Sequence, residues 1–344
     1  MDKQLFNEAF KRNGKIYEPD EDSEIYLTNI FLVDFNKILK DLKTSLPSMP
    51  QIEVNFLDGN NLGANAVIYK DRYFIAIQQG SLKILMDIFL RMLASPTIFP
   101  ILGISAKEQE NEKVEVAQIR SYERFLLNDI KMQMPNDIRR KEVALLMLRY
   151  AIRQLFLHEL AHLIRGHYHW LYIEGNSKDC PPLIRQGMEM DADRFAINLV
   201  LNQFKLEDEQ ADLPNTHLVL EEQIFIWGFA LAISLNLFPD MEDASDFDNT
   251  ETPPVALRYG LILTETVFTV FKDHKKLKDI SAAIFQAIKL PKEAFSQIQT
   301  ERPYTHFNMS ICPKMMEHNK KIHKAWMEFE NELSTISLVS LGYN

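Results

Sequence analysis

The sequence predicts an α+β fold that is mainly helical, with one small sheet near residues 66–79. Apolar residues alternate on either side of a Lys70-Asp71 turn, which is typical of a hairpin or of two short strands: Val67, Tyr69, Tyr73, Ile75 and Ile77. Helices are predicted at 141–167 and 184–201, where apolar side chains recur at intervals of three and four residues.

Composition and charge indicate a globular protein that does not bind nucleic acid. The chain has 344 residues, 46% of them hydrophobic and 25% charged, and its formal net charge is −10. A surface for nucleic acid would need clustered Lys and Arg. The two cysteines, Cys180 and Cys312, are too few for a disulfide framework and suit a reducing compartment.

Neither the N-terminal residues nor the most apolar run of the chain predicts an association with membranes. The first residues are polar and lack the apolar core of a signal peptide. The run from Ile224 to Phe238 is short for a bilayer span and contains Ser234 and Asn236, so a buried core helix is expected there. We therefore expect a cytoplasmic protein without a membrane partner.

Changes in composition suggest three parts. An N-terminal segment, 1–50, ends in a Pro-rich stretch and is expected to pack on the core. The core, 51–270, contains a charged helical insertion at 103–140 that is either a solvated excursion or a lid. A helical region, 271–344, follows.

The stretch His158-Glu159-Leu160-Ala161-His162 matches the pattern H-E-x-x-H. Residues four apart lie on the same face of a helix, so His158 and His162 can direct ring nitrogens at one cation. Glu159 lies about 100° around the helix, where it can reach a water molecule at the metal without binding the metal itself. These residues predict a site for one zinc ion per chain, with Glu159 as the general base.

A third zinc ligand is expected in the helix at 184–201. Gly166 and His169 stand one position too late for a third histidine at the usual spacing, and His167 points elsewhere if the helix continues. A carboxylate is the better candidate. Glu189 and Asp193 lie four apart on the face opposite Phe195, and we expect Glu189 as the ligand, with Asp191 or Asp193 as fallbacks.

The H-E-L-A-H motif followed by E-x-x-A-D resembles the gluzincin metallopeptidases, especially the HtpX and CAAX-prenyl-protease type. Two further segments are similar to that family, His162 to His167 as an H-x-x-x-x-H motif and Thr252 to Arg258 as an H-P-P-x-x-x-R segment. The resemblance implies a zincin-like core, with Asp193 behind a histidine ligand and Arg258 beside Asp193. Thr252 departs from the family's histidine, and the family's membrane helices are missing.

The resemblance also implies an active-site edge strand that pairs with extended substrate, and we expect it here in the segment Phe74, Ile75, Ala76, Ile77 and Gln78. A buried strand is the alternative for this segment. The developing oxyanion needs a hydrogen-bond donor. The sequence offers four candidates without ranking them, namely Tyr168, Tyr172, His167 and Arg258.

Together these features predict a zinc-dependent endopeptidase that acts on a cytosolic protein or peptide. Lit-type phage-exclusion peptidases look similar in size and motif, which implies a triggered defence protease that cuts a translation factor. The alternatives are a housekeeping processing or quality-control metallopeptidase, and a non-catalytic zinc-binding interaction protein. Cys180 could cap the zinc as a thiolate, but a buried cysteine is expected.

Overall fold

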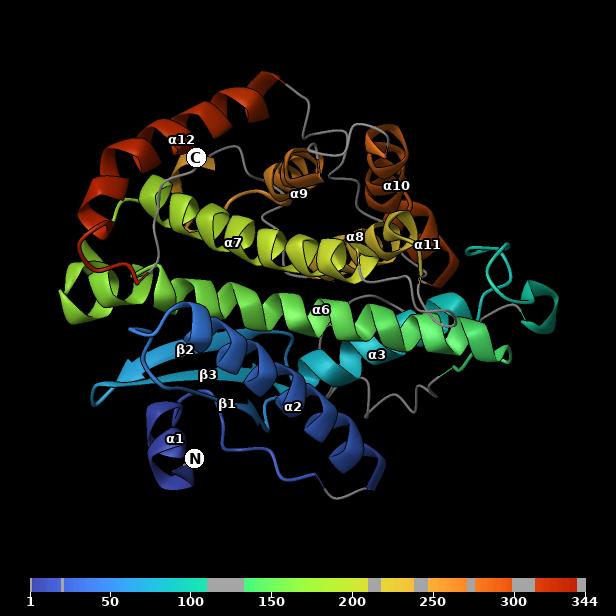
Figure 1. Cartoon of the computed structure of the whole chain (residues 1–344), viewed down its shortest axis with the longest axis horizontal. Helices are drawn as coiled ribbons and strands as arrows, with labels where there is room; N and C mark the ends of the chain where they lie inside the picture. Colours follow the sequence, from blue (N-terminus) through green and yellow to red (C-terminus); the bar gives the residue numbers. More distant parts are fainter. Residues whose placement is uncertain are drawn as a thin grey trace.

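The computed structural model describes residues 2–19, 22–109, 133–209, 218–237, 247–270, 276–298 and 313–338. These residues form a mainly helical protein with a small three-stranded sheet (Figure 1), so the predicted α+β class is confirmed. Most of the charged insertion predicted at 103–140 lies outside the described residues.

The sheet has the strand order β1-β3-β2. Strand β1 (Ile52–Leu57) runs parallel to β3 (Arg72–Gln78), and β2 (Ala64–Tyr69) runs antiparallel to β3. The β2–β3 turn has positive φ angles at Lys70 (49°) and Asp71 (57°), which is typical of the tight turns that join hairpin strands. The predicted hairpin is therefore confirmed.

The prediction that Phe74–Gln78 is an edge strand is wrong. These residues form most of β3, which pairs with β1 on one side and β2 on the other. Phe74, Ile75, Ala76 and Ile77 are all 0% exposed. The alternative interpretation, a buried strand, is correct, because the unpredicted strand β1 covers the second side of β3.

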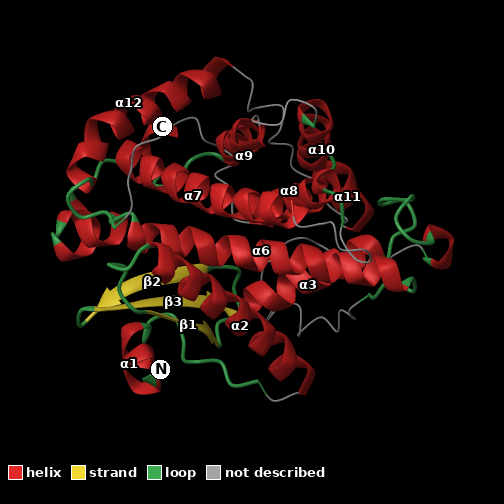
Figure 2. Cartoon of the chain, in the orientation of Figure 1, coloured by secondary structure: helices red, strands yellow, loops and turns green. Residues whose placement is uncertain are grey.

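Helices cover both faces of this sheet (Figure 2). Helix α1 (Lys3–Ala9) packs on one face, where Phe6 and Phe10 meet Phe74. The other face joins the main core with α2 (Asp22–Ser45), α3 (Gln79–Leu93) and α6 (Ile138–Ile164).

Helix α6 packs along α7 (Pro182–Glu209), and the later helices surround this pair. They are α8 (Leu220–Leu237), α9 (Val255–Val270), α10 (Leu277–Lys289), α11 (Pro291–Ile298) and α12 (Pro313–Leu333). Single turns occur at Ser105–Lys107, His169–Ile173, Asn176–Lys178 and Phe247–Asn249. Among the described helices, α8 alone has the length and apolar composition of a membrane span, and 78% of its apolar window is buried in the protein, as expected for a core helix.

Both ends of α6 are defined by local chemistry. The Asp137 carboxylate accepts hydrogen bonds from the backbone N–H groups of Arg139 and Arg140 and caps the N-terminus. The helix stops at Ile164 because Gly166 adopts a left-handed conformation with a φ angle of 84°. The predicted end at 167 is therefore too late, and His167 lies outside the helix.

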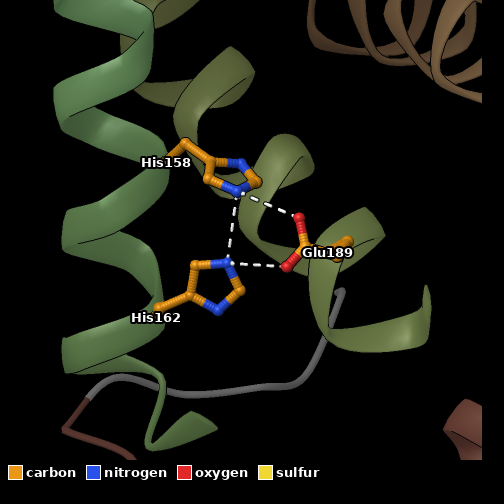
Figure 3. A group of neighbouring side chains, drawn as sticks. All are labelled: His158, His162 and Glu189. Carbon is orange, nitrogen blue, oxygen red and sulfur yellow. Dashed lines mark hydrogen bonds and ion pairs between the residues drawn. The ribbon is translucent and has the colours of Figure 1, made fainter. Parts of the chain in front are cut away.

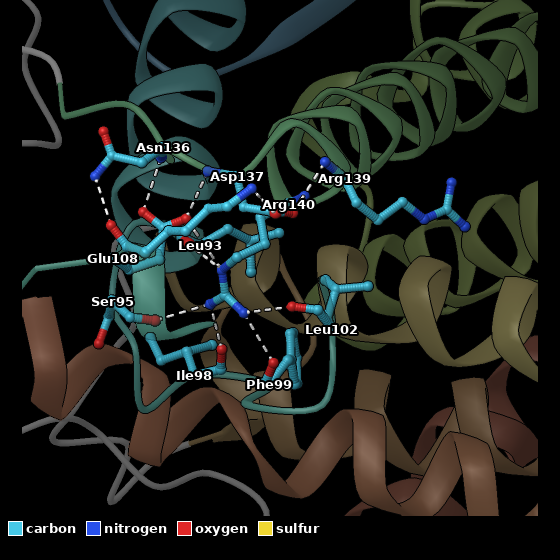
Figure 4. Close-up of polar contacts among 11 residues, drawn as sticks. Leu93, Ser95, Ile98, Phe99, Leu102, Glu108, Asn136, Asp137, Arg139 and Arg140 are labelled. Atoms are coloured by element: carbon cyan, nitrogen blue, oxygen red, sulfur yellow. Dashed lines mark hydrogen bonds and ion pairs between the residues drawn. The ribbon is translucent and has the colours of Figure 1, made fainter. Parts of the chain in front are cut away.

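The N-terminal end of α6 is fixed to the preceding loop by Arg140 (Figure 4). This side chain is 0% exposed, and each of its five N–H groups donates to a different backbone carbonyl. The Nε atom lies 2.7 Å from the oxygen of Leu93, and the acceptors for the two Nη atoms are Ser95, Ile98, Phe99 and Leu102. Arg140 therefore holds a loop that has little regular structure of its own.

Replacing Arg140 with lysine is expected to destabilise the protein by about 3 kcal/mol, since an ammonium group has fewer donors and leaves buried carbonyls unpaired. Urea unfolding measures the change. The control is Arg139→Lys, because the Arg139 side chain is 50% exposed and its ion pair is with Glu142, one turn along the helix. That variant should change stability by less than about 0.5 kcal/mol. Equal unfolding midpoints for the two variants would contradict this account.

Candidate metal centre

Three side chains from α6 and α7 converge at one point (Figure 3). His158 and His162 lie one turn apart on α6, and Glu189 faces them from α7. The Nε2 atoms of the histidines lie 3.2 Å apart. The Glu189 Oε2 atom lies 3.2 Å from Nε2 of His158, and its Oε1 atom lies 3.4 Å from Nε2 of His162.

These separations fit a tetrahedral metal ion. Zinc binds nitrogen and carboxylate oxygen at about 2.0–2.2 Å, which places neighbouring ligand atoms of a tetrahedron about 3.3 Å apart. Within the described residues, His158, His162 and Glu189 are the one group of His, Cys, Asp or Glu side chains whose donor atoms converge in this way. His169 lies in the π-helical turn after α6 and is not part of the group.

Asp193 and Arg258 support His158 from behind. Nδ1 of His158 lies 2.9 Å from Oδ1 of Asp193, which as a carboxylate can only accept, so Nδ1 carries the proton. The Arg258 guanidinium donates to both Asp193 oxygens, at 2.6 and 2.7 Å. Burial raises the pKa of Asp193, but Arg258 and His158 outweigh burial and hold this pKa below its usual value. With Nδ1 held as the donor to Asp193, Nε2 of His158 is the atom whose lone pair would bind a metal ion that displaces its proton.

The electrostatics of the group favour a cation. Burial opposes protonation of His158, yet hydrogen bonds to Asp193 and Glu189 raise its pKa to about 10. Burial also opposes the charge on Glu189, but His162 and His158 hold its pKa well below the usual value. Three lone-pair donors this close repel one another unless a proton or a metal ion lies between them. The donor set, two imidazoles and one carboxylate, is one that zinc accepts.

His162 is supported by a second set of side chains. Nδ1 of His162 lies 3.0 Å from Nδ1 of His167, and Nε2 of His167 lies 3.2 Å from Oδ2 of Asp191. Arg165 donates to both Asp191 oxygens at 2.5 Å. Burial lowers the pKa of His167 to about 4, so this ring is neutral near pH 7. Asp191, a fallback ligand in the sequence, contacts Arg165 and His167 and does not join the convergent group.

Glu159 lies beside the convergent group without belonging to it. The Tyr168 hydroxyl donates to Oε2 of Glu159 at 3.2 Å, and the Tyr168 ring stacks on His162 with centroids 4.9 Å apart. Burial, and then the charges of Glu159 and Glu189, raise the pKa of Tyr168 well above its usual value. Tyr168 is therefore a protonated donor at neutral pH. Tyr172 packs on Tyr168 but is 58% exposed.

The group is partly open to solvent. The His158 side chain is 13% exposed and the Glu189 side chain 25% exposed, whereas the His162 side chain is only 4% exposed. Structural zinc sites are closed by four protein ligands, and catalytic sites keep one position for water or substrate. Three donors with this exposure leave room for a further ligand.

Cys180 takes no part in the centre. Its side chain packs in an apolar cluster with Leu171, Met188 and Trp326, and burial raises the pKa of the thiol. The expectation of a buried cysteine is confirmed.

Sequence reasoning missed Arg165 and Trp326. Arg165 falls within the H-x-x-x-x-H segment. Asp191 stands between Glu189 and Asp193, which share a helix face, so its carboxylate points to another side and needs a cation of its own. Trp326 lies on α12, and its ring meets His167 edge-on with centroids 5.7 Å apart. No local pattern around Trp326 indicates this contact.

Comparison with known proteins found no matching family model, and no curated protein or solved structure with significant similarity.

Proposed function

We propose that this protein is a zinc-dependent endopeptidase whose zinc is held by His158, His162 and Glu189. The observation that carries the proposal is the place of Glu159. Glu159 is only 8% exposed and follows the proposed ligand His158 in the chain. Its carboxylate is nevertheless not one of the three converging donors. A purely structural zinc site has no use for such a group, whereas hydrolysis requires a base there.

When bound, zinc would act as a Lewis acid that activates a water molecule at neutral pH and polarises the scissile carbonyl. Glu159 accepts a proton from the attacking water and later delivers it to the leaving amine. Tyr168 is the best placed oxyanion donor, because its hydroxyl already lies within 3.2 Å of Glu159 and stays protonated. Arg258 is not proposed for that role, since Asp193 holds its guanidinium.

Strand β2, in place of β3, is the proposed binding edge for extended substrate. It is an outer strand of the sheet and it lies against α6. The outer side of β1 is partly occupied by a bridge between Ile16 and Leu57. The backbone N–H of Gln78 donates to the carbonyl of Gly63 at 3.0 Å, so these two residues form a hydrogen-bonded pair. In an antiparallel pair of strands, every second residue of β2 from this point hydrogen-bonds to β3. By this alternation, the residues whose backbone groups face away from β3 are Ala64, Ala66 and Ile68.

Replacing Ala66 with proline is expected to lower kcat/KM for peptide cleavage by about tenfold or more. The change removes an outward N–H, and one hydrogen bond contributes about 1–1.5 kcal/mol. The measurement is steady-state cleavage of one peptide by each variant. Ala66→Gly keeps the N–H while also disturbing the strand, so it should retain most of the activity. An equal loss in both variants would argue against substrate pairing along β2.

The activity itself is tested with a mixture of unstructured peptides. The zinc-loaded protein should cleave peptide bonds, stop when a chelator removes the metal, and regain cleavage when stoichiometric zinc is returned. Product analysis by mass spectrometry gives the cleavage sites. Zinc binding without cleavage of any peptide or protein would favour the alternative, a non-catalytic zinc-binding interaction protein.

The proposed substrate is a cytosolic protein. The resemblance to phage-exclusion peptidases favours a triggered defence protease that cuts one target, such as a translation factor. Proteomics of cells that express the wild type, compared with cells that express Glu159→Gln, would identify the target. Broad cleavage of unfolded proteins would instead indicate a quality-control peptidase.

A further inference from the structure

We infer that His167 is a positioning residue that fixes the ring tautomer of His162 through a buried relay of His162, His167, Asp191 and Arg165. This inference rests on the proposed function, because it gives His167 the role of orienting the proposed metal ligand His162. The H-x-x-x-x-H segment contains three of these residues but gives no contact between them, and Asp191 joins them only because the fold places the middle of α7 beside the loop after α6.

The direction of the hydrogen bonds follows from the geometry. Nε2 of His162 faces Glu189 and His158, so it must keep its lone pair in order to bind a metal. The proton of the neutral His162 ring is then on Nδ1, which donates across 3.0 Å to Nδ1 of His167. His167 consequently carries its own proton on Nε2. That atom is buried and lies 3.2 Å from Oδ2 of Asp191, a close contact whose alignment does not make it a hydrogen bond.

A buried ion pair ends the relay. The Asp191 and Arg165 side chains are 1% and 4% exposed, and their two hydrogen bonds are both 2.5 Å long. The charges of Asp191 and Arg165 compensate each other, so the relay as a whole is neutral.

The fold encloses the relay on the side away from the metal. Gly166 turns the chain so that His167 points back toward α6, and the space that a Cβ atom would take at Gly166 is filled by Ile336. Trp326 of α12 closes over the His167 ring, which is 0% exposed. His167 is therefore the acceptor that the fold places within reach of Nδ1 of His162.

The two ligand histidines thus have different supports. His158 donates to a carboxylate, Asp193, whereas His162 donates to a neutral ring. A carboxylate strengthens its imidazole as a donor to the metal more than a neutral acceptor does. The relay orients His162 without adding a second negative charge directly behind it.

Two substitutions of nearly equal size separate the two contacts of His167, with His162 and with Asp191. In His167→Asn, the amide oxygen can take the place of Nδ1 and accept from His162, but nothing reaches Asp191. In His167→Gln, the amide nitrogen can take the place of Nε2 and donate to Asp191, but His162 loses its acceptor. Zinc affinity by chelator competition, the visible spectrum of the cobalt-substituted protein, and thermal unfolding without metal are measured for both.

His167→Gln is expected to lower zinc affinity by about 10- to 100-fold and to alter the cobalt spectrum. His167→Asn should stay within about threefold of the wild type, with an unchanged spectrum. Both variants should lose similar thermal stability. A residue that serves packing alone would give equal losses of affinity in the two variants, and that result would overturn the inference.

A direct reading of the tautomers distinguishes failure of the relay from failure of the proposed function. In protein labelled with ¹⁵N-histidine, the His167 ring should be neutral with its proton on Nε2, and the ring of His162 should be protonated on Nδ1. The opposite tautomer at His167 overturns the relay even if zinc binds. These tautomers in a wild type that binds no zinc would overturn the proposed function, and with it any role of His167 in positioning a ligand.

Discussion

Replacing Glu159 with glutamine is expected to reduce peptide cleavage by at least about 10²–10⁴-fold while one zinc ion stays bound. Glutamine keeps the shape of the side chain and can still accept the Tyr168 hydroxyl, but it cannot take a proton from water. Since Glu159 is not one of the three converging donors, the metal should be retained. Initial cleavage rates and the zinc content of the same preparations are the two measurements.

The matched control is Glu142→Gln, on the same helix. The Glu142 side chain is 58% exposed and pairs with Arg139, so its loss should leave both cleavage and zinc unchanged. If Glu159→Gln keeps more than about a tenth of the wild-type rate, Glu159 is not the general base. If the variant loses its zinc, Glu159 is a ligand and the proposed division of roles is wrong.

Replacing Glu189 with alanine is expected to remove the zinc. Glu189 is the one donor of the group that comes from α7, and it contacts both histidines. Loss of a group that merely supports a ligand lowers metal affinity about 10- to 100-fold, so loss of a ligand should lower it further. Titration with zinc against a chelator measures the change, and cleavage should fall with metal occupancy.

Two controls accompany Glu189→Ala. Glu174→Ala removes an exposed carboxylate from the segment between α6 and α7 and should leave zinc affinity unchanged. His169→Ala tests the rival ligand, which lies in the π-helical turn outside the convergent group. Loss of zinc in His169→Ala but not in Glu189→Ala would mean that the third ligand is assigned to the wrong residue.

Much of the candidate site follows from spacing within helices, which the sequence determines locally. Residues four apart share a helix face, so the sequence predicts that His158 and His162 point to the same place, and the structure brings them together. The same rule pairs Glu189 with Asp193 on α7, and Asp193 lies behind His158 as the family resemblance implies. The hairpin at 66–79 was predictable because its turn and its alternation are also local.

The parts that were not predicted depend on contacts between distant segments. The apolar residues Ile52, Val54 and Phe56 alternate with polar ones, which marks a strand locally, but the parallel pairing of β1 with β3 joins segments on either side of β2 and has no local signal. That omission led to the wrong edge strand. A helix that continues to 167 would point the His167 ring away from the ligands, but the left-handed Gly166 ends α6, and Nδ1 of His167 lies 3.0 Å from Nδ1 of His162.

The zinc content of the wild-type protein, purified without chelators, tests the central claim most directly. We expect about one zinc ion per chain, lost on dialysis against a strong chelator and regained on adding one equivalent of zinc. The substitutions His158→Ala and His162→Ala should each prevent that return. A wild-type protein that contains no zinc and binds none when zinc is supplied would contradict the metal centre and the peptidase activity proposed from it.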